Sequence, residues 1–207
     1  HEVVIVCTLA EGENAAAIRE NGVRVEVVPV RKWSNWRDTL KLAWFLRKEK
    51  PDVVHSHLYR QNVPATRAAR LAGVPAIYAN LHLVGTYQNQ RWIDIDRRLA
   101  KKRTAMIAVS QAVADDIREA LEPCPDLRIE VLLNGVDLKK YGVQDRAECR
   151  PRLLDEFGWT EDTVVFLSAA RLSPEKNQAQ LLEAFAKVHA EHPRARLLLA
   201  GGGDLRE

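Results

Sequence analysis

The chain of 207 residues is 46% hydrophobic and 29% charged, which is typical of a soluble globular protein. Its 31 lysines and arginines, against 28 aspartates and glutamates, leave a balance too even to indicate a nucleic-acid-binding protein. Cys7, Cys124 and Cys149 lack the close spacing of zinc or redox motifs, and no apolar run reaches the roughly 18 to 20 residues of a membrane span. We therefore expect a cytoplasmic protein with reduced thiols.

Short apolar runs alternate with amphipathic stretches along the first two thirds of the chain. Strands are predicted over Val3–Cys7, Val23–Val28, Val53–His57, Ala76–Leu81, Ala105–Val109 and Ile129–Leu133. Helices are predicted over Asn14–Glu20, Thr39–Lys48, Pro64–Ala72, and from the N-cap Ser110 through Leu121. The segment between Leu81 and Ala105 is polar and basic, and no bounds are predicted for an element in it. Strands that alternate with helices indicate an α/β fold with a parallel sheet and right-handed crossovers.

The chain loses its strand pattern between Leu138 and Glu161, where it is polar and one helix is predicted over Pro151–Phe157. We interpret this stretch as the passage between a first domain, residues 1–138, and a second, residues 139–207. The second domain begins with a predicted strand at Val164 and continues through a helix to a strand over Arg196–Ala200. Three glycines then follow in a row.

A basic loop follows the strand that begins at Val164. Arg171 and Lys176 lie between this strand and an amphipathic helix that either Ser173 with Pro174 or Asn177 can open. In an open parallel sheet such a loop lies at the carboxyl edge of the strands, where ligands bind, and the following helix offers free N–H groups. Two cations there suit an anion, and phosphate is the anion we expect. The alternative is that both are solvated loop charges.

The run AARLSPEKNQAQLLEAF, residues 169–185, resembles the donor-phosphate signature of the retaining GT-B glycosyltransferases of family four, typified by the "glycosyl transferases group 1" domain. Three further segments resemble this family in the expected order. These are PDVVHSH, residues 51–57, IAVSQAVADDI, residues 107–117, and LLNGVDLKKY, residues 132–141. The resemblance therefore covers nearly the whole chain.

The resemblance implies a GT-B-type fold of two Rossmann-like parallel-sheet domains, both incomplete in this chain. The acceptor-side domain would lack its first strand and glycine-rich loop, and the donor-binding domain would stop after its opening βαβ unit, before a pair of glutamates that hold the donor. The implied reaction transfers a hexose-type sugar from a nucleotide diphosphate donor to an acceptor with retention. The acceptor is a glycan, a lipid-linked molecule or a small molecule, and neither a metal nor a cofactor is required.

The resemblance also assigns roles to individual residues. Arg171 and Lys176 would bind the donor diphosphate and stabilise the charge of the leaving group. His82, at the end of a predicted strand, would contact the transferred sugar; the alternative is an ordinary polar loop residue. Gly201, Gly202 and Gly203 would let the backbone approach the nucleotide base; the alternative is a simple turn.

Two other features have weaker functional interpretations. His55 and His57 lie on one face of a strand, as in a metal pair, but no carboxylate or thiolate accompanies them, so structural or acceptor-side polar roles are favoured. Ser110 lacks the glycines of a nucleophile elbow and is expected to cap a helix.

Two basic stretches carry tryptophans, which is the composition of a membrane-surface patch as well as of a solvated helix face. The first holds Arg31, Lys32, Trp33, Trp36 and Arg37, and the second holds Arg91, Trp92, Arg97, Arg98, Lys101, Lys102 and Arg103. A peripheral contact with the inner face of a membrane is therefore an alternative to a purely cytoplasmic location.

Three other functions remain open from the sequence. A sugar-nucleotide epimerase or a glycogen-type phosphorylase relative would share the fold. A truncated, non-catalytic remnant would fold and bind nucleotide weakly without transferring sugar. An acceptor-dependent release of nucleotide diphosphate distinguishes the transferase from all three.

Overall fold

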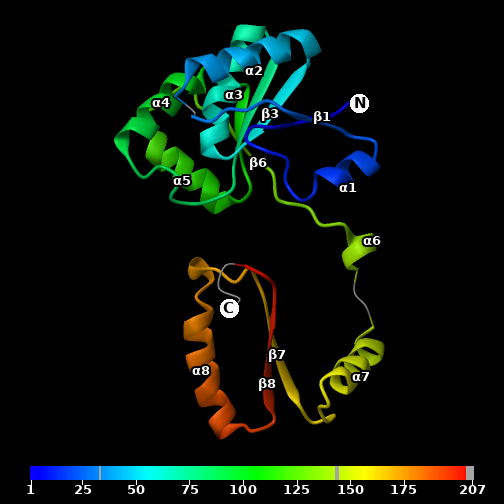
Figure 1. Cartoon of the computed structure of the whole chain (residues 1–207). Helices are drawn as coiled ribbons and strands as arrows, with labels where there is room; N and C mark the ends of the chain where they lie inside the picture. Colours follow the sequence, from blue (N-terminus) through cyan, green and yellow to red (C-terminus); the bar gives the residue numbers. More distant parts are fainter. Residues whose placement is uncertain (33, 143–144, 204–207) are drawn as a thin grey trace. The chain divides into compact units, whose positions relative to one another are not determined.

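The computed structural model describes residues 1–32, 34–142 and 145–203, which divide into two compact units, His1–Gly135 and Val136–Glu207. Each unit contains parallel strands with helices between them (Figure 1). The prediction of an α/β fold with parallel sheets is therefore confirmed.

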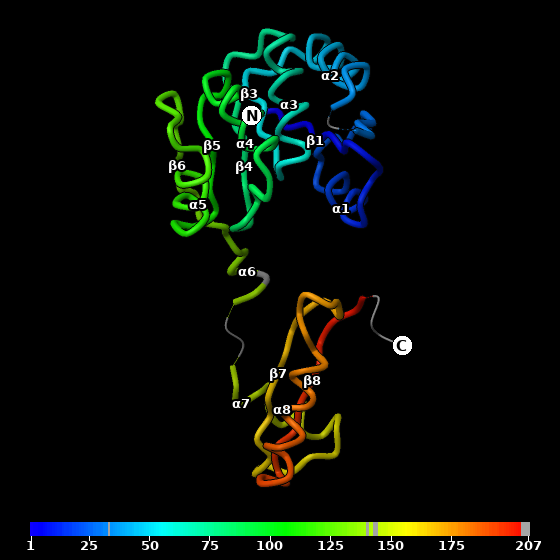
Figure 2. Tube along the Cα trace, turned by 90° about the vertical axis from the view of Figure 1, so that its left-hand side faces the viewer, coloured from blue at the N-terminus to red at the C-terminus, as the bar shows by residue number. Residues whose placement is uncertain are grey.

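Unit 1 alternates strands and helices along its whole length. Its elements are β1 Val4–Cys7, α1 Ala15–Glu20, β2 Arg24–Val27, α2 Trp36–Glu49, β3 Val53–His57, α3 Tyr59–Ala72, β4 Ala76–Leu81, α4 Gln90–Ala100, β5 Ala105–Ala108, α5 Gln111–Leu121 and β6 Ile129–Val131. β1 pairs with β2 in one parallel sheet, and a second parallel sheet has the order β3-β4-β5-β6 (Figure 2). The parallel pairing brings the carboxyl ends of β3, β4 and β5 to one edge.

The core of unit 1 comprises two clusters: one joins β4 and β5 to α3, α4 and α5, and the other packs α2 against α3 and β4. All four residues of β5 are buried, so this strand is apolar on both faces, as expected for the centre of a parallel sheet. Val63 of α3, together with Ala114 and Ile117 of α5, is fully buried. Ser110 accepts a hydrogen bond from the Val113 amide at 3.3 Å, so its predicted role as a helix cap is confirmed.

Three helices of unit 1 differ from the sequence expectation. α2 begins at Trp36 rather than Thr39, because the Asn35 side chain accepts from the Arg37 amide and caps the helix. α3 begins directly after β3 rather than at Pro64, which lies inside the helix, because packing in the core outweighs the cost of an interior proline. α4 occupies the segment for which no bounds were predicted.

Unit 2 holds α6 Leu138–Tyr141, α7 Arg146–Glu156, β7 Val164–Ala169, a 3-10 turn Pro174–Lys176, α8 Gln178–Glu191 and β8 Ala195–Ala200. β7 and β8 pair in parallel from Val164 opposite Ala195 to Ala169 opposite Ala200. The helix predicted from Pro151 begins earlier, since Asp145 accepts from the Ala147 amide and caps it. The predicted start at Ser173 and Pro174 gives only the 3-10 turn, and Asn177 precedes α8 without a side-chain cap.

Candidate functional site

The basic loop of unit 2 connects the carboxyl end of β7 to α8. The side chains of Arg171 and Lys176 are exposed, and within the described residues neither makes an ion pair or a side-chain hydrogen bond. The charge nearest to them in sequence is Glu175. Its pKa is held below the ordinary value, first by its own backbone amide and also by the positive charges of Arg171 and Lys176. Because neither cation is paired within the described residues, both side chains of the loop are available to bind an anion.

The glycines after β8 run beside this loop. The Ala170 amide donates to the Ala200 carbonyl at 3.0 Å, and the Leu172 amide donates to the Gly202 carbonyl at 2.9 Å. A Cβ at Gly201, whose φ is 155°, would overlap the Ala170 carbonyl oxygen, and one at Gly203 would overlap that of Leu172. The structure thus brings the predicted glycines against the loop that carries Arg171, and the close approach requires glycine at 201 and 203.

Gln178, the first residue of α8, contacts this loop and was not predicted from the sequence. It is 9% exposed, and its side-chain amide donates to the Arg171 carbonyl at 2.7 Å. This hydrogen bond joins the first residue of α8 to the loop and so fixes the backbone position of Arg171. The run Lys176-Asn177-Gln178 could have indicated it, because a polar residue at the start of a helix often bonds the preceding turn.

Three histidines meet at the carboxyl edge of the four-stranded sheet in unit 1. His57 Nδ1 lies 3.1 Å from His82 Nε2, so one ring donates a hydrogen bond to the other. The rings of His55 and His57 have centroids 4.4 Å apart. His57 of β3 pairs with Asn80 of β4, and Asn80 lies two residues before His82. This register places the side chains of His57 and His82 next to each other. The partnership of His57 with His82 was not predicted, although parallel strands ending in histidine could have suggested it.

Two rings of the histidine cluster, those of His55 and His57, favour the neutral form. Burial lowers the pKa of His55, and the nearby charge of His82 lowers it further. Burial is also the main cause of the lowered pKa of His57, followed by the charges of His55 and His82. Neutral imidazoles can both donate to and accept from a hydroxyl group, which suits contact with a sugar. His82 belongs to unit 1, whereas the two cations belong to unit 2.

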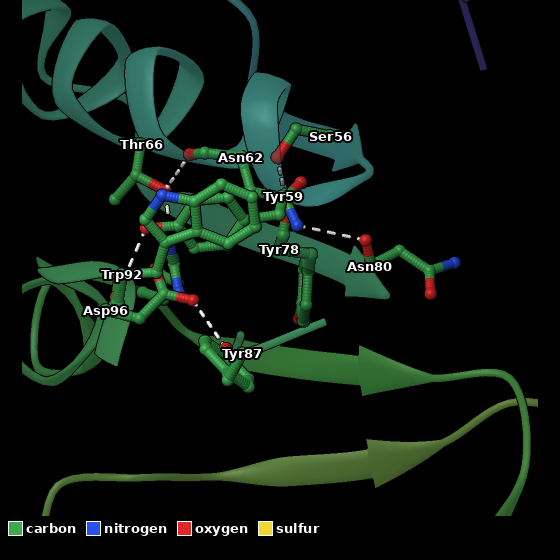
Figure 3. Close-up of polar contacts among 10 residues, drawn as sticks. Ser56, Tyr59, Asn62, Thr66, Tyr78, Asn80, Tyr87, Trp92 and Asp96 are labelled. Atoms are coloured by element: carbon green, nitrogen blue, oxygen red, sulfur yellow. Dashed lines mark hydrogen bonds and ion pairs between the residues drawn. The ribbon is translucent and has the colours of Figure 1, made fainter. Parts of the chain in front are cut away.

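A buried polar network holds the loop that follows His82 (Figure 3). Tyr87, near the end of this loop, donates its hydroxyl to Asp96 at 2.6 Å. Asp96 pairs with Arg103 at 2.7 Å, and the side chains of this ion pair are 0% and 1% exposed. Arg103 also donates from Nε to the Thr66 hydroxyl on α3 at 3.0 Å.

An aromatic contact and a backbone contact complete these anchors. Tyr59 at the start of α3 packs edge-to-face against Tyr87 of the loop, with ring centroids 6.0 Å apart. The Gly85 amide donates to Asp116 of α5 at 3.1 Å. The His82 loop is thus fixed to three helices, which supplies the rigid support that a contact residue requires.

The second basic stretch is a solvated face only in part, because Arg91, Arg98, Lys101 and Lys102 are exposed, whereas its other two arginines bond within the fold. Arg103 is buried in the ion pair with Asp96. Arg97 donates to the carbonyls of Ala120, Leu121 and Glu122, so its charge lies at the carboxyl end of α5. A cation at this end interacts favourably with the helix dipole. Of the first stretch, Trp33 lies outside the described residues.

Within residues 1–32, 34–142 and 145–203, no group of three or more histidines, cysteines or acidic residues could hold a metal ion. No helix in the same ranges is both long and apolar enough to cross a membrane.

Two protein-family models match the chain. The model described as Glycosyltransferase Family 4 matches residues 1–140, and the model described as Glycosyl transferases group 1 matches residues 150–207.

Curated proteins and solved structures give related matches. The chain is 29% identical to the UDP-Gal:alpha-D-GlcNAc-diphosphoundecaprenol alpha-1,3-galactosyltransferase of Escherichia coli, over 82% of this chain and 45% of that protein. It is 31% identical to a D-inositol 3-phosphate glycosyltransferase of Nocardioides sp., over 70% of this chain and 33% of that protein. The crystal structure of Anabaena HepE in complex with UDP and glucose is similar with a TM-score of 0.76 and 20% identity.

The chain is shorter than the proteins it matches. It covers 45% and 33% of the two curated relatives and 53% of the HepE chain, so it spans about half of their length or less. At 20% identity the likeness to HepE concerns the fold alone.

Proposed function

The chain belongs to glycosyltransferase family 4, and we propose that its protein transfers a hexose-type sugar from a nucleotide diphosphate donor to an acceptor with retention at the anomeric carbon. In this proposal residues 1–138 form the acceptor-side domain and residues 139–207 begin the donor-binding domain. The names of the two curated relatives specify a UDP-sugar donor in one case and a glycosyltransferase in both, which supports the reaction class.

The observation that carries the proposal is the basic loop beside the glycines of unit 2. Arg171 and Lys176 bind the donor diphosphate and stabilise the negative charge that develops on it as the sugar leaves. Fixed cations are well suited to this role, because they need no reorganisation during the reaction. Gly201 and Gly203 support the assignment, since their backbone lies against the loop that carries Arg171, and Gly202 between them faces open space that a nucleotide could approach.

His82 contacts the transferred sugar in this mechanism. Its ring is half-buried at the end of β4, where a parallel sheet binds ligands, and His57 orients it through the 3.1 Å contact. Because the pKa of His57 is lowered chiefly by burial, that ring is neutral near pH 7 and can orient His82 without a second positive charge. Neither a metal nor a cofactor is required for these roles.

A test uses the whole protein with a panel of nucleotide sugars and acceptors and measures released nucleotide diphosphate. We expect release to depend on the acceptor, and Lys176→Ala or Arg171→Ala to lower turnover by about a hundredfold or more, by analogy with removal of an oxyanion-stabilising donor. Lys187→Ala, an exposed lysine further along α8, is the matched control.

Other outcomes would overturn the assignment. Conversion of one nucleotide sugar into another without release would indicate an epimerase, and no release with any pair would indicate a non-catalytic remnant. A Lys176→Ala protein with unchanged turnover would remove the loop from the mechanism. The anomeric configuration of the product, determined by NMR, tests retention.

We further propose a peripheral contact of α2 with an anionic membrane surface. Trp36, Leu40 and Trp44 recur every four residues along one side of α2, and their exposed fractions are 57%, 55% and 69%. Lys41 and Lys48 are exposed on the same helix, without ion pairs among the described residues. Exposed tryptophans beside lysines are typical of helices that lie in a membrane interface. This contact suits a lipid-linked acceptor.

Vesicle co-sedimentation of the whole protein tests this contact. We expect more protein to sediment with anionic than with neutral vesicles, and Trp36→Ser with Trp44→Ser to remove the difference. Leu71→Ser, which changes an exposed apolar residue on α3, is the control. Equal sedimentation with both kinds of vesicle would exclude the membrane contact.

A further inference from the structure

The turn between β3 and α3 has a strained backbone. Leu58, which joins His57 of β3 to Tyr59 of α3, has φ 69° and ψ 146°. Because a Cβ crowds the backbone at positive φ, this conformation is essentially restricted to glycine. Lys50 and Asn177 also have a positive φ, but their ψ values of 50° and 44° place them in the left-handed helical region, which side chains tolerate better. The conformation of Leu58 therefore persists because other contacts of the fold hold it.

One carbonyl group at the end of β4 holds this turn. The Asn80 carbonyl accepts from the backbone amide of Leu58 at 3.0 Å and from the side-chain amide of Asn62 at 2.9 Å. Figure 3 shows the Asn62 side chain directed at this carbonyl. A carbonyl oxygen has two lone pairs, so both hydrogen bonds form together. The Leu58 carbonyl in turn accepts from the backbone amides of Gln61 and Asn62 at 3.1 and 2.9 Å. The turn is thus bonded to β4 and to the first turn of α3.

The same two strand ends carry the interacting histidines. His57 immediately precedes Leu58, and His82 follows Asn80 by two residues. The bonds to the Asn80 carbonyl therefore join the two strand ends at the point where His57 Nδ1 lies 3.1 Å from His82 Nε2. A change of φ at Leu58 rotates the peptide group that joins it to His57. Relaxation of the turn would consequently change the direction of the His57 ring.

The amide of Asn62 is better suited to holding the turn than to stabilising the core. Its side chain is 0% exposed, and its Oδ1 has no hydrogen-bond partner in the part of the chain that the structure describes. A buried amide oxygen without a partner lowers stability. A leucine of similar volume would avoid this cost, but it could not donate to the Asn80 carbonyl. The hydrogen bond is therefore the contribution that an apolar side chain cannot replace.

We propose that Asn62 is a positioning residue for sugar transfer: its amide holds the strained turn at Leu58, and this turn directs His57 towards His82. The inference rests on the proposed transferase function, in which His82 contacts the transferred sugar and His57 orients it. Asn62 acts through His57 and is not a catalytic residue. A misdirected His57 should slow the transfer step, whereas donor binding in unit 2 should not change.

Steady-state kinetics of the whole protein test this role. In Asn62→Leu we expect kcat to fall by between about tenfold and a hundredfold, the effect of misplacing a contact group by about 1 Å. The KM for the nucleotide sugar should change by less than about twofold. The Tm should stay within about 5 °C of the parent protein, because the substitution also removes the unpaired Oδ1.

A control removes another hydrogen bond between the same two strands. The Ser56 hydroxyl donates to the Tyr78 carbonyl at 3.2 Å, so Ser56→Ala breaks a side-chain bond from β3 to β4 and leaves the turn in place. Its kcat should stay within about twofold of the parent protein. Asn62→Ala, which removes the donor and adds no atoms, replaces Asn62→Leu if that protein does not fold. Loss of folding in both Asn62 variants would assign this residue to stability and overturn the inference.

A second substitution distinguishes positioning from packing. Glycine adopts a positive φ without steric cost, so Leu58→Gly removes the strain that the Asn62 amide offsets. We expect Asn62→Leu combined with Leu58→Gly to recover kcat to within about threefold of the parent protein. Glycine at position 58 would not repair a packing defect at position 62. Unchanged kcat in Asn62→Leu, or no recovery in the double variant, would overturn the inference.

NMR of the whole protein labelled with nitrogen-15 histidine follows the geometry without an activity assay. His57 Nδ1 and His82 Nε2 are in hydrogen-bond contact, so their signals should shift in Asn62→Leu and return in the double variant. His189 and His192 belong to unit 2, and their signals should not shift. If the signals shift as expected but the parent protein transfers no sugar, the proposed function fails and the contact held by Asn62 stands. If the parent protein transfers sugar but the signals do not shift, the positioning role fails and the function stands.

Discussion

Replacement of Arg103 by methionine should destabilise unit 1 strongly. In the folded protein the Arg103 guanidinium lies 2.7 Å from Asp96, and both side chains are almost fully removed from water. The variant leaves the Asp96 carboxylate buried, with only the Tyr87 hydroxyl as a side-chain donor. Loss of one partner from such a buried pair costs about 3 to 5 kcal/mol, because the remaining charge keeps its desolvation penalty.

Urea unfolding followed by circular dichroism measures this cost. With a urea dependence of about 2 kcal/mol per molar, the midpoint should fall by about 1.5 to 2.5 M. Tyr87→Phe removes one hydrogen bond to a charged group and should cost about 1.5 to 3 kcal/mol. Arg98→Met, which changes an exposed arginine of α4, should stay within about 0.5 kcal/mol of the parent protein.

A double variant distinguishes the loss of the Arg103–Asp96 ion pair from a loss of packing contacts. Arg103→Met combined with Asp96→Leu removes both charges, so its loss should be smaller than the sum of the two single losses by about 1 kcal/mol or more. The reasoning is refuted if Arg103→Met shifts the midpoint no further than Arg98→Met does. Additive losses in the double variant would also refute it.

Three other predictions follow from unit 2 and the histidine cluster. Gly201→Ala should cost about 1 to 3 kcal/mol in thermal or urea unfolding, since its φ of 155° and the Ala170 carbonyl exclude a Cβ, whereas Gly202→Ala, with open space, should cost less; equal losses would contradict the close approach. The pKa of His57 is lowered in the folded protein, mainly by burial, so the unfolded chain binds a proton at a higher pH than the folded chain does. The contribution of His57 to the free energy of unfolding should therefore be complete above pH 6.5 and should fall as the pH drops below 6.5. His57→Gln should weaken this pH dependence of stability between pH 7.5 and 5.5, and an unchanged pH dependence would contradict the prediction. The 207-residue chain alone should aggregate, because apolar side chains such as Leu167, 64% exposed, lie on the two-stranded sheet of unit 2; a reversible transition of a monodisperse monomer would disprove this.

Hydrophobic periodicity predicted the eight strands of the described residues but bounded neither α4 nor the short α6. The strands predicted over Val53–His57 and Ala76–Leu81 agree with the bounds of β3 and β4 because each is a short run of strand-forming residues. The burial along them does not alternate: Ser56 is the buried residue of β3, and β4 buries Ala79, Asn80 and Leu81 in succession.

For α4 the reason is physical. No bounds were predicted for α4 because the residue at its centre that faces the core is Asp96, which interrupts the hydrophobic pattern. Asp96 can be buried there because it pairs with the buried guanidinium of Arg103. A pairing between distant charges leaves no local signal.

The candidate site was predictable where it is contiguous in sequence. Arg171 and Lys176 share one short loop, and Gly201 to Gly203 follow one strand, so motif and spacing were sufficient to single them out. The contact of His57 with His82 depends on which strands become neighbours in the sheet. Such contacts require the three-dimensional arrangement.

The core of unit 1 contains a built-in spectroscopic reporter. Met106, the one methionine in the chain, is 1% exposed and pairs within β5 with Ala79 of β4 and Ile129 of β6. Its single methyl group, labelled with carbon-13, would give one NMR signal from the centre of the four-stranded sheet. Ligands that bind at the strand ends of unit 1 could then be followed through this signal without assignment of the remaining spectrum.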